Sequence, residues 1–235
     1  MQQRHDLYGP IHKALRKRAC ELLVQAGQAD FAEDATRFGM IDAVRRHLDF
    51  ISVHLWHEES FVHPALRARD AAVAAILEDQ HASHGEAMRD TLRCLDALEG
   101  VSDAEAAQAG RALYLSLARL LAHDLAHMDH EETVVQPLLH HWFDDTALQG
   151  MMAAITASMP HEELMEAMRE MLPALSVDEC ARMVGGIRAT LPAGIAEGFV
   201  PGVVQPMLAP DQYARLVEVL GERPRPVAPA AADDA

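Results

Sequence analysis

Two stretches of the chain carry residues whose types and spacing could bind a metal ion. His54 to Leu66 and His127 to Leu139 both read His-x-x-His-Glu-Glu-x-x-Val-x-Pro-x-Leu, at an offset of 73 residues. On a helix, a His and a Glu four positions apart lie about 40° from each other, so each copy directs an imidazole and a carboxylate the same way. This repeat predicts two similar helical hairpins whose His-Glu pairs face each other.

The charge of the repeated glutamates is the reason to expect a cation. Glu58 and Glu131 share the apolar faces of their helices, and no Lys or Arg occupies the inward positions beside them. An ionised carboxylate on a buried face is costly unless it is paired or binds a metal. Imidazole and carboxylate ligands without thiolate suit iron or manganese better than structural zinc. The adjacent Glu59 and Glu132 are interpreted as solvated charges.

Four long helices must position these residues. The apolar spacing predicts helices over residues 7–28, 34–67, 71–98 and 102–141, with Ser102 and Glu105 as a capping box at the start of the last one. Pro64 and Pro137 are expected to kink or end their helices just past the His-Glu pairs. The expected fold is an all-α, antiparallel, up-down four-helix bundle.

Each predicted helix offers at least one inward ligand. Shifting the first hairpin by 73 residues places His12 on Gly85, one position from His84, and this nominates His84 as the ligand of the third helix. His81 lies about 60° from His84 on that helix. It could be a further ligand, a hydrogen-bond donor to a ligand, or a histidine of the core. The candidate metal ligands are His12, His54, Glu58, His81, His84, His127 and Glu131.

The sequence beyond the bundle predicts a helical appendage. We expect residues 1–142 to form the bundle, 143–222 an appendage of shorter helices and 223–235 a disordered tail. Amphipathic segments lie near 145–158, 161–172, 177–190 and 211–220, and prolines separate them. The methionines there recur at helical intervals, which favours core packing over a soft-metal site. The tail is rich in Pro and Ala and has no means of burying apolar surface.

Composition excludes several classes of partner. Acidic residues exceed basic ones by 16, so nucleic acid and anionic membrane surfaces would be repelled. The three cysteines are isolated, which suggests reduced thiols rather than disulfides or a zinc ribbon. No signal-peptide pattern and no apolar run of membrane-spanning length occurs in the sequence, and we expect a cytoplasmic location.

The motifs resemble those of the hemerythrin-like, or HHE, cation-binding family over roughly residues 7–142. The resemblance lies in the start Ile11-His12-Lys13-Ala14-Leu15-Arg16, the two His-x-x-x-Glu pairs and the intervening His84. It implies a hemerythrin-like bundle around an oxo- or hydroxo-bridged di-iron centre, with Glu58 and Glu131 as bridging carboxylates and the histidines as terminal ligands. Manganese or zinc could load into similar ligands. The spacing departs from that of oxygen-carrying hemerythrins, which have two histidines one turn apart on the third helix and a His-x-x-x-x-Asp on the fourth.

The leading hypothesis is a non-haem di-iron protein that binds a small oxidant, such as dioxygen, peroxide or nitric oxide, as a carrier, scavenger or sensor. His57 or His130 is the expected donor to the bound ligand. One alternative is a di-iron enzyme with peroxidase or ferroxidase activity. Another is an iron- or redox-responsive interaction module, with a protein partner or self-association through the appendage. A zinc peptidase is excluded, because no His-Glu-x-x-His occurs in the sequence.

Overall fold

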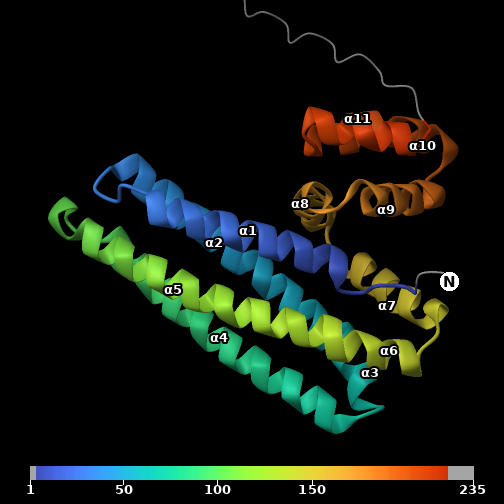
Figure 1. Ribbon diagram of the computed structural model, residues 1–235, viewed down its shortest axis with the longest axis horizontal. Coiled ribbons are helices and arrows are strands. Elements are labelled where there is room, and N and C mark those ends of the chain that lie inside the picture. The colour runs from blue at the N-terminus through green and yellow to red at the C-terminus, as the bar shows by residue number, and fades with distance from the viewer. Residues whose placement is uncertain (1–3, 222–235) are drawn as a thin grey trace, which may run out of the picture. The chain divides into compact units, whose positions relative to one another are not determined.

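The computed structural model describes residues 4–221, and every regular element within them is helical. Four long helices form the main body: α1 (Gly9–Gln28), α2 (Asp34–His57), α4 (Ala71–Glu99) and α5 (Asp103–His130). Helix α1 packs against α2 and α5, and α4 packs against the same two helices, so the four close into a bundle (Figure 1). The all-α, hemerythrin-like fold expected from the sequence is confirmed.

The bundle is held together by apolar residues at helical spacing. Val44, Leu95 and Leu113 come from three of the four helices and are completely shielded from solvent, and Leu15 of α1 is 4% exposed. Burying side chains of this size contributes roughly 1.5–3 kcal/mol each relative to leaving them exposed. The bundle core therefore fixes how the four helices lie against one another, and with them any side chains they direct inward.

Each His-Glu-Glu motif is followed by a π-helical turn. Helix α2 passes through η1 (Glu58–Val62) into α3 (His63–Arg67), and α5 passes through η2 (Glu131–Val135) into α6 (Gln136–Trp142). The backbone N–H of His63 bonds to the carbonyl of Glu58, five residues back, and Gln136 does the same to Glu131. The prolines next in sequence, Pro64 and Pro137, thus do not end the helices, because helical turns continue through both of them.

The starts of α4 and α5 are capped differently. The side chain of Asp70 accepts hydrogen bonds from the backbone N–H groups of Ala72 and Val73, which caps α4. The capping box expected at Ser102 does not form, since its hydroxyl donates to the Glu105 carboxylate at 2.8 Å instead of accepting from the backbone. A complete capping box occurs at Ser176 and Glu179.

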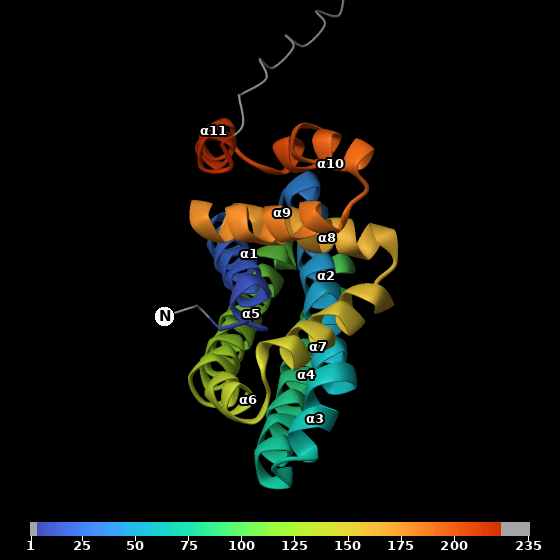
Figure 2. The same cartoon turned by 90° about the vertical axis from the view of Figure 1, so that its right-hand side faces the viewer.

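A short helix extends the first compact unit beyond the bundle. Helix α7 (Asp145–Ser158) places Leu148 in a core cluster with Leu66 of α3 and Leu139 of α6, and Figure 2 shows α7 alongside α3. The first unit ends at Leu164 and the second begins at Met165. The sequence places this boundary near residue 142, ahead of α7, because periodicity along one helix does not reveal which core that helix joins.

The second unit has an apolar core of its own. It comprises most of α8 (His161–Met171), then η3 (Leu172–Ala174), α9 (Val177–Thr190), α10 (Ala193–Phe199), η4 (Val200–Val204), η5 (Gln205–Met207) and α11 (Pro210–Val219). Leu172, Val184 and Val204 are completely buried there, with Met165, Met168, Met183 and Met207 packed in the same cluster. The methionines thus serve packing, as expected. The proposed tail, 223–235, lies outside the described residues.

No helix among residues 4–221 combines the length and the apolar character needed to cross a bilayer.

Candidate metal centre

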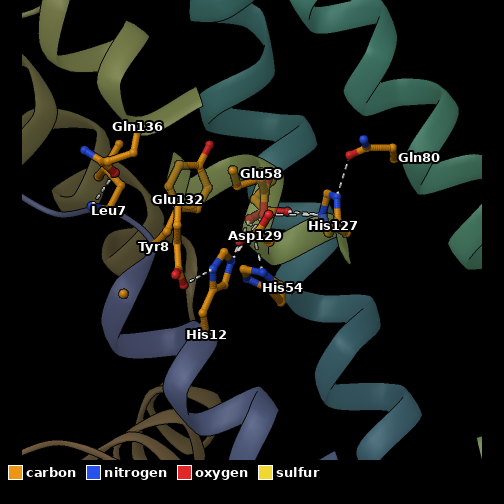
Figure 3. A network of polar contacts seen from close by, with 12 residues as sticks. Leu7, Tyr8, His12, His54, Glu58, Gln80, His127, Asp129, Glu132 and Gln136 are labelled. Atoms are coloured by element: carbon orange, nitrogen blue, oxygen red, sulfur yellow. Dashed lines mark hydrogen bonds and ion pairs between the residues drawn. The ribbon is translucent and has the colours of Figure 1, made fainter. Parts of the chain in front are cut away.

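Six side chains from all four bundle helices and both π-helical turns converge inside the bundle. His12 comes from α1, His54 from the last turn of α2, His81 from α4 and His127 from the last turn of α5. Glu58 and Glu131 are the first residues of η1 and η2. We call these six residues, all buried, the His/Glu cluster. Figure 3 shows the imidazoles of His12, His54 and His127 directed toward the carboxylates.

The His/Glu cluster divides into two groups that share both carboxylates. One group is His12, His54, Glu58 and Glu131, and the other is Glu58, His81, His127 and Glu131; in each, the ligand atoms lie within 4.8 Å of one another. Either group could hold a cation with two imidazoles and two carboxylates, and Glu58 and Glu131 belong to both groups.

Glu58 turns one oxygen to each group. Its Oε1 lies 3.1 Å from Nε2 of His54, and its Oε2 lies 3.4 Å from Nε2 of His81. Glu131 uses a single oxygen for both, since its Oε2 lies 3.2 Å from Nε2 of His12 and 3.4 Å from Nε2 of His127. Both carboxylates therefore contact both groups, Glu58 through two oxygen atoms and Glu131 through one.

The converging atoms have no hydrogen-bond partners among residues 4–221. Despite the short separations, the inward Nε2 atoms of the four histidines and all four oxygens of Glu58 and Glu131 are buried without an aligned hydrogen bond. Leaving a buried polar group unsatisfied costs about 1–3 kcal/mol, and more if it is charged. Eight such atoms facing one another fit a bound cation pair, which would satisfy all of them at once.

The outer nitrogens of two of these histidines are held by carboxylates from the opposite hairpin. His12 Nδ1 lies 2.9 Å from Glu132 Oε1, and His81 Nδ1 lies 2.9 Å from Glu59 Oε1. Glu132 also accepts a hydrogen bond from Arg16 at 2.6 Å. The interpretation of Glu59 and Glu132 as merely solvated charges was wrong, because a single-helix projection cannot show an acceptor reaching a neighbouring helix. These contacts fix the imidazole rings with Nε2 inward.

The electrostatics of the cluster require positive charge. Burial alone would raise the pKa of Glu58, but the surrounding imidazoles hold it well below its usual value. Burial and the charge of Glu58 raise the pKa of Glu131. Burial lowers the pKa of His54 to about 3, so its imidazole is neutral at pH 7 with a lone pair available. Burial opposes charge on His12 and His81 as well, but the neighbouring carboxylates raise the pKa of both. Protons on these imidazoles therefore balance the carboxylates in the metal-free protein, and a bound cation would replace them.

His84, expected as the ligand of the third helix, lies outside both groups. Its Nε2 is 2.5 Å from Oδ1 of Asp124 on α5, whereas His81 joins the cluster. The physical reason is helical periodicity. Gly85 occupies the repeat position of His12, and His81 lies one turn before Gly85, about 40° away, while His84 lies about 100° away. His84, the histidine nearest in sequence to Gly85, therefore lies on a different face of α4 from His81.

Two further residues at the cluster were missed or set aside. Tyr8 stacks on His12 with ring centroids 5.2 Å apart, and its buried hydroxyl has no partner. Burial, with the charges of Glu131 and Glu58, raises the pKa of Tyr8 well above its usual value, so the phenol keeps its proton. His63, which the repeat does not single out, packs against His81 with centroids 4.7 Å apart. No motif marks Tyr8, which lies at the start of the predicted helix 7–28 and directly ahead of α1.

The fold and the His/Glu cluster together define a helical-bundle cation-binding domain. A family model described as the hemerythrin HHE cation binding domain matches residues 9–139, more than half of the chain, and the chain belongs to this family. The resemblance drawn from the sequence is thus confirmed. The comparisons with curated proteins and with solved structures found no match.

Proposed function

We propose that the protein is a non-haem di-iron protein that binds a small oxidant, such as dioxygen, peroxide or nitric oxide, as a carrier, scavenger or sensor. The observation that carries this proposal is the pair of four-residue groups that share Glu58 and Glu131 and leave eight buried donor atoms without a protein partner. The site is built for two cations side by side.

The donor atoms favour iron among the available cations. Each group supplies two imidazole nitrogens and carboxylate oxygens, with no cysteine in either group. Structural zinc sites commonly include thiolate and close all their positions with protein ligands. Bound iron would supply electrons and an open coordination position to a small ligand. Manganese and zinc fit the same donor types less selectively and are expected as substitutes during expression.

The chain's own residues then prepare the site for a small ligand. Glu132 and Glu59 hold the rings of His12 and His81, and Gln80 Oε1 lies 3.0 Å from Nδ1 of His127. The six cluster side chains are each less than 9% exposed, which keeps bulk water from the donor atoms. Water exclusion strengthens electrostatic interactions inside the site.

Metal analysis of purified variants tests the ligand assignment. His54→Ala and His81→Ala should each lose most of the bound iron, because each removes a nitrogen that no neighbouring side chain replaces. His84→Ala should keep its iron, since His84 pairs with Asp124 instead. His123→Ala, an exposed histidine one turn before His127, is the matched control. Equal iron in all four variants would refute the assignment.

Spectroscopy of the iron-loaded protein tests the function. The protein is reduced without oxygen, re-exposed to air, and followed by its ultraviolet and visible absorption. A reversible oxygen-dependent spectrum supports carriage or sensing. Irreversible bleaching with turnover of added peroxide supports the enzymatic alternative. A reduced iron protein that shows no spectral response to air, peroxide or nitric oxide contradicts the proposal.

A further inference from the structure

The hydroxyl of Tyr8 is a buried polar group that the site described so far does not use. Tyr8 is 1% exposed, and its hydroxyl oxygen has no hydrogen-bond partner in the part of the chain that the structure describes. Its ring lies against His12 at an interplanar angle of 29°. A buried hydroxyl without an acceptor costs about 1–3 kcal/mol, so its placement needs a reason.

The segment that carries Tyr8 is tied to the bundle on both sides. The side chain of Asp6 accepts hydrogen bonds from the backbone N–H groups of Tyr8 and Gly9, at 3.0 and 2.9 Å. The Gln136 side chain accepts from Leu7 N–H at 3.2 Å and donates to the carbonyl of His5 at 3.2 Å. These bonds fix the backbone on either side of the ring. The phenol is therefore held in place beside His12.

The hydroxyl is close enough to both shared carboxylates to feel their charge. Glu131 and Glu58 each act electrostatically on Tyr8, and Figure 3 shows the Tyr8 ring beside His12 with its hydroxyl end on the side of Glu58. Neither carboxylate accepts a hydrogen bond from it, because all four of their oxygens are unpartnered. The described residues thus supply no acceptor for this O–H.

We propose that Tyr8 donates a hydrogen bond to a small anionic ligand bound in the His/Glu cluster, such as a reduced oxygen species or azide. This inference rests on the proposed function and names the residue that meets the charge of the ligand. His57, one donor expected from the sequence, belongs to neither ligand group, and its Nε2 lies 3.6 Å from Glu163, too far for a hydrogen bond. A neutral phenol donor favours anions over neutral diatomic molecules.

Azide binding to the oxidised, iron-loaded protein is the test, with Tyr8→Phe as the variant. The substitution removes one oxygen atom and keeps the ring that stacks on His12. Iron content should equal that of the wild type, while the dissociation constant for azide should rise about tenfold or more, as expected for losing a hydrogen bond to a charged acceptor. Tyr114→Phe is the control, since Tyr114 precedes His127 by 13 residues on α5, about 20 Å along the helix.

Two further readouts separate a hydrogen bond from a merely structural effect. The infrared stretch of bound azide should shift between H₂O and D₂O in the wild type and in Tyr114→Phe, and this shift should vanish in Tyr8→Phe. In the metal-free state, Tyr8→Phe should be at least as stable to heat as the wild type, because the hydroxyl has no acceptor there. A clear loss of metal-free stability would mean that the hydroxyl serves the protein and would overturn the proposal.

The failures of the two proposals are distinguishable. Equal azide affinity and an unchanged deuterium shift in an iron-loaded Tyr8→Phe protein would overturn the role of Tyr8 and leave the di-iron assignment intact. A wild-type protein that takes up no iron would overturn the proposed function and the inference with it.

Discussion

The carboxylates of Glu132 and Glu59 fix the ring orientation and the tautomer of two histidines of the cluster. In the apo protein an imidazole can rotate or change tautomer, and only one arrangement directs a lone pair at the cation positions. Glu132 and Glu59 select that arrangement for His12 and His81 by accepting from Nδ1. Side chains in this role commonly contribute one to two orders of magnitude to metal affinity.

Removing either carboxylate should therefore weaken metal binding without removing a ligand. We expect Glu132→Ala and Glu59→Ala to lower iron affinity about tenfold to hundredfold in competition with a chelator. The effect of Glu132→Ala should be larger, because the Glu132 side chain is 32% exposed and bound by Arg16, whereas that of Glu59 is 54% exposed. Exposed Glu86→Ala is the control. Affinities equal to the control would show that these contacts do not orient the rings.

The buried imidazole of His47 makes the stability of the folded protein depend on pH. Burial lowers the pKa of His47 to about 4. Its pKa in the unfolded chain is near 6.5. Below pH 6.5, His47 therefore binds a proton in the unfolded chain but not in the folded protein. The free energy of unfolding decreases as the pH falls from 6.5 toward 4. The loss reaches about 1.4 kcal/mol per pH unit for one such group.

Urea unfolding of the metal-free protein between pH 4 and 7 measures this dependence. His47→Gln should flatten the decline in unfolding free energy by close to one proton, while exposed His123→Gln should leave it unchanged. The metal-free protein is used so that release of metal in acid does not contribute. A slope in His47→Gln as steep as that of the wild type would contradict the assignment.

Among the elements, the close contact between α5 and the connection from α1 to α2 depends on the absence of a side chain at Gly110. Gly110 lies within α5, and a Cβ atom placed there would overlap the ring of Phe31 from the connection between α1 and α2. Overpacking of this kind typically costs about 1–3 kcal/mol. Gly110→Ala should lower the free energy of unfolding by this amount, as measured with urea.

Gly39→Ala is the matched comparison for that substitution. Gly39 lies within α2, and a Cβ atom there meets no other atom within 4 Å. Replacing an unobstructed helical Gly by Ala typically stabilises by about 0.5–1 kcal/mol. Equal effects of the two substitutions would mean that the Phe31 ring moves aside freely.

Sequence periodicity predicted the bounds of the long helices well, but it did not predict the local irregularities or the elements that form through tertiary packing. The predicted ranges 34–67 and 71–98 match the observed ends at Arg67 and Glu99 closely, because Pro, Gly and a capping Asp70 mark them chemically. The π-helical turns were not predicted, since periodicity assumes a uniform α-helix and no residue type marks a local bond from i to i+5. Helix α10 was also missed, because its Gly-rich sequence has low helix propensity and forms through tertiary packing.

The candidate site was predictable where two helices repeat the same motif. His54, Glu58, His127 and Glu131 follow from the repeat alone. The sequence alone does not favour His81 over His84. His81 lies one helical turn before Gly85, the position that the repeat assigns to His12, so the repeat does not identify it. Tyr8, Glu59 and Glu132 depend on contacts between helices, and no pattern within one helix encodes such a contact.

At the scale of the whole molecule, the chain contains two compact units with separate apolar cores. Both tryptophans, Trp56 and Trp142, lie in the first unit, and Cys180 is buried in the second. Burial raises the pKa of the Cys180 thiol to about 11, which suppresses the reactive thiolate at pH 8. The two units therefore carry independent natural probes.

Metal should stabilise only the unit that holds the cluster. Iron binding should raise the thermal midpoint measured by tryptophan fluorescence, because the ion binds the folded bundle and not the unfolded chain. The temperature at which Cys180 becomes open to alkylation should stay the same, with exposed Cys20 reacting throughout as the internal reference. A joint shift of both midpoints would show that the two units unfold together.

The crossed contacts between hairpins bear on how such a bundle could have arisen. His12 is steadied by a carboxylate from the second hairpin, and His81 by the equivalent carboxylate from the first. An ancestral peptide with only one hairpin would have lacked every one of these reciprocal contacts. It could have assembled the complete site only as a symmetric dimer, and gene duplication with fusion would then have made that partnership permanent.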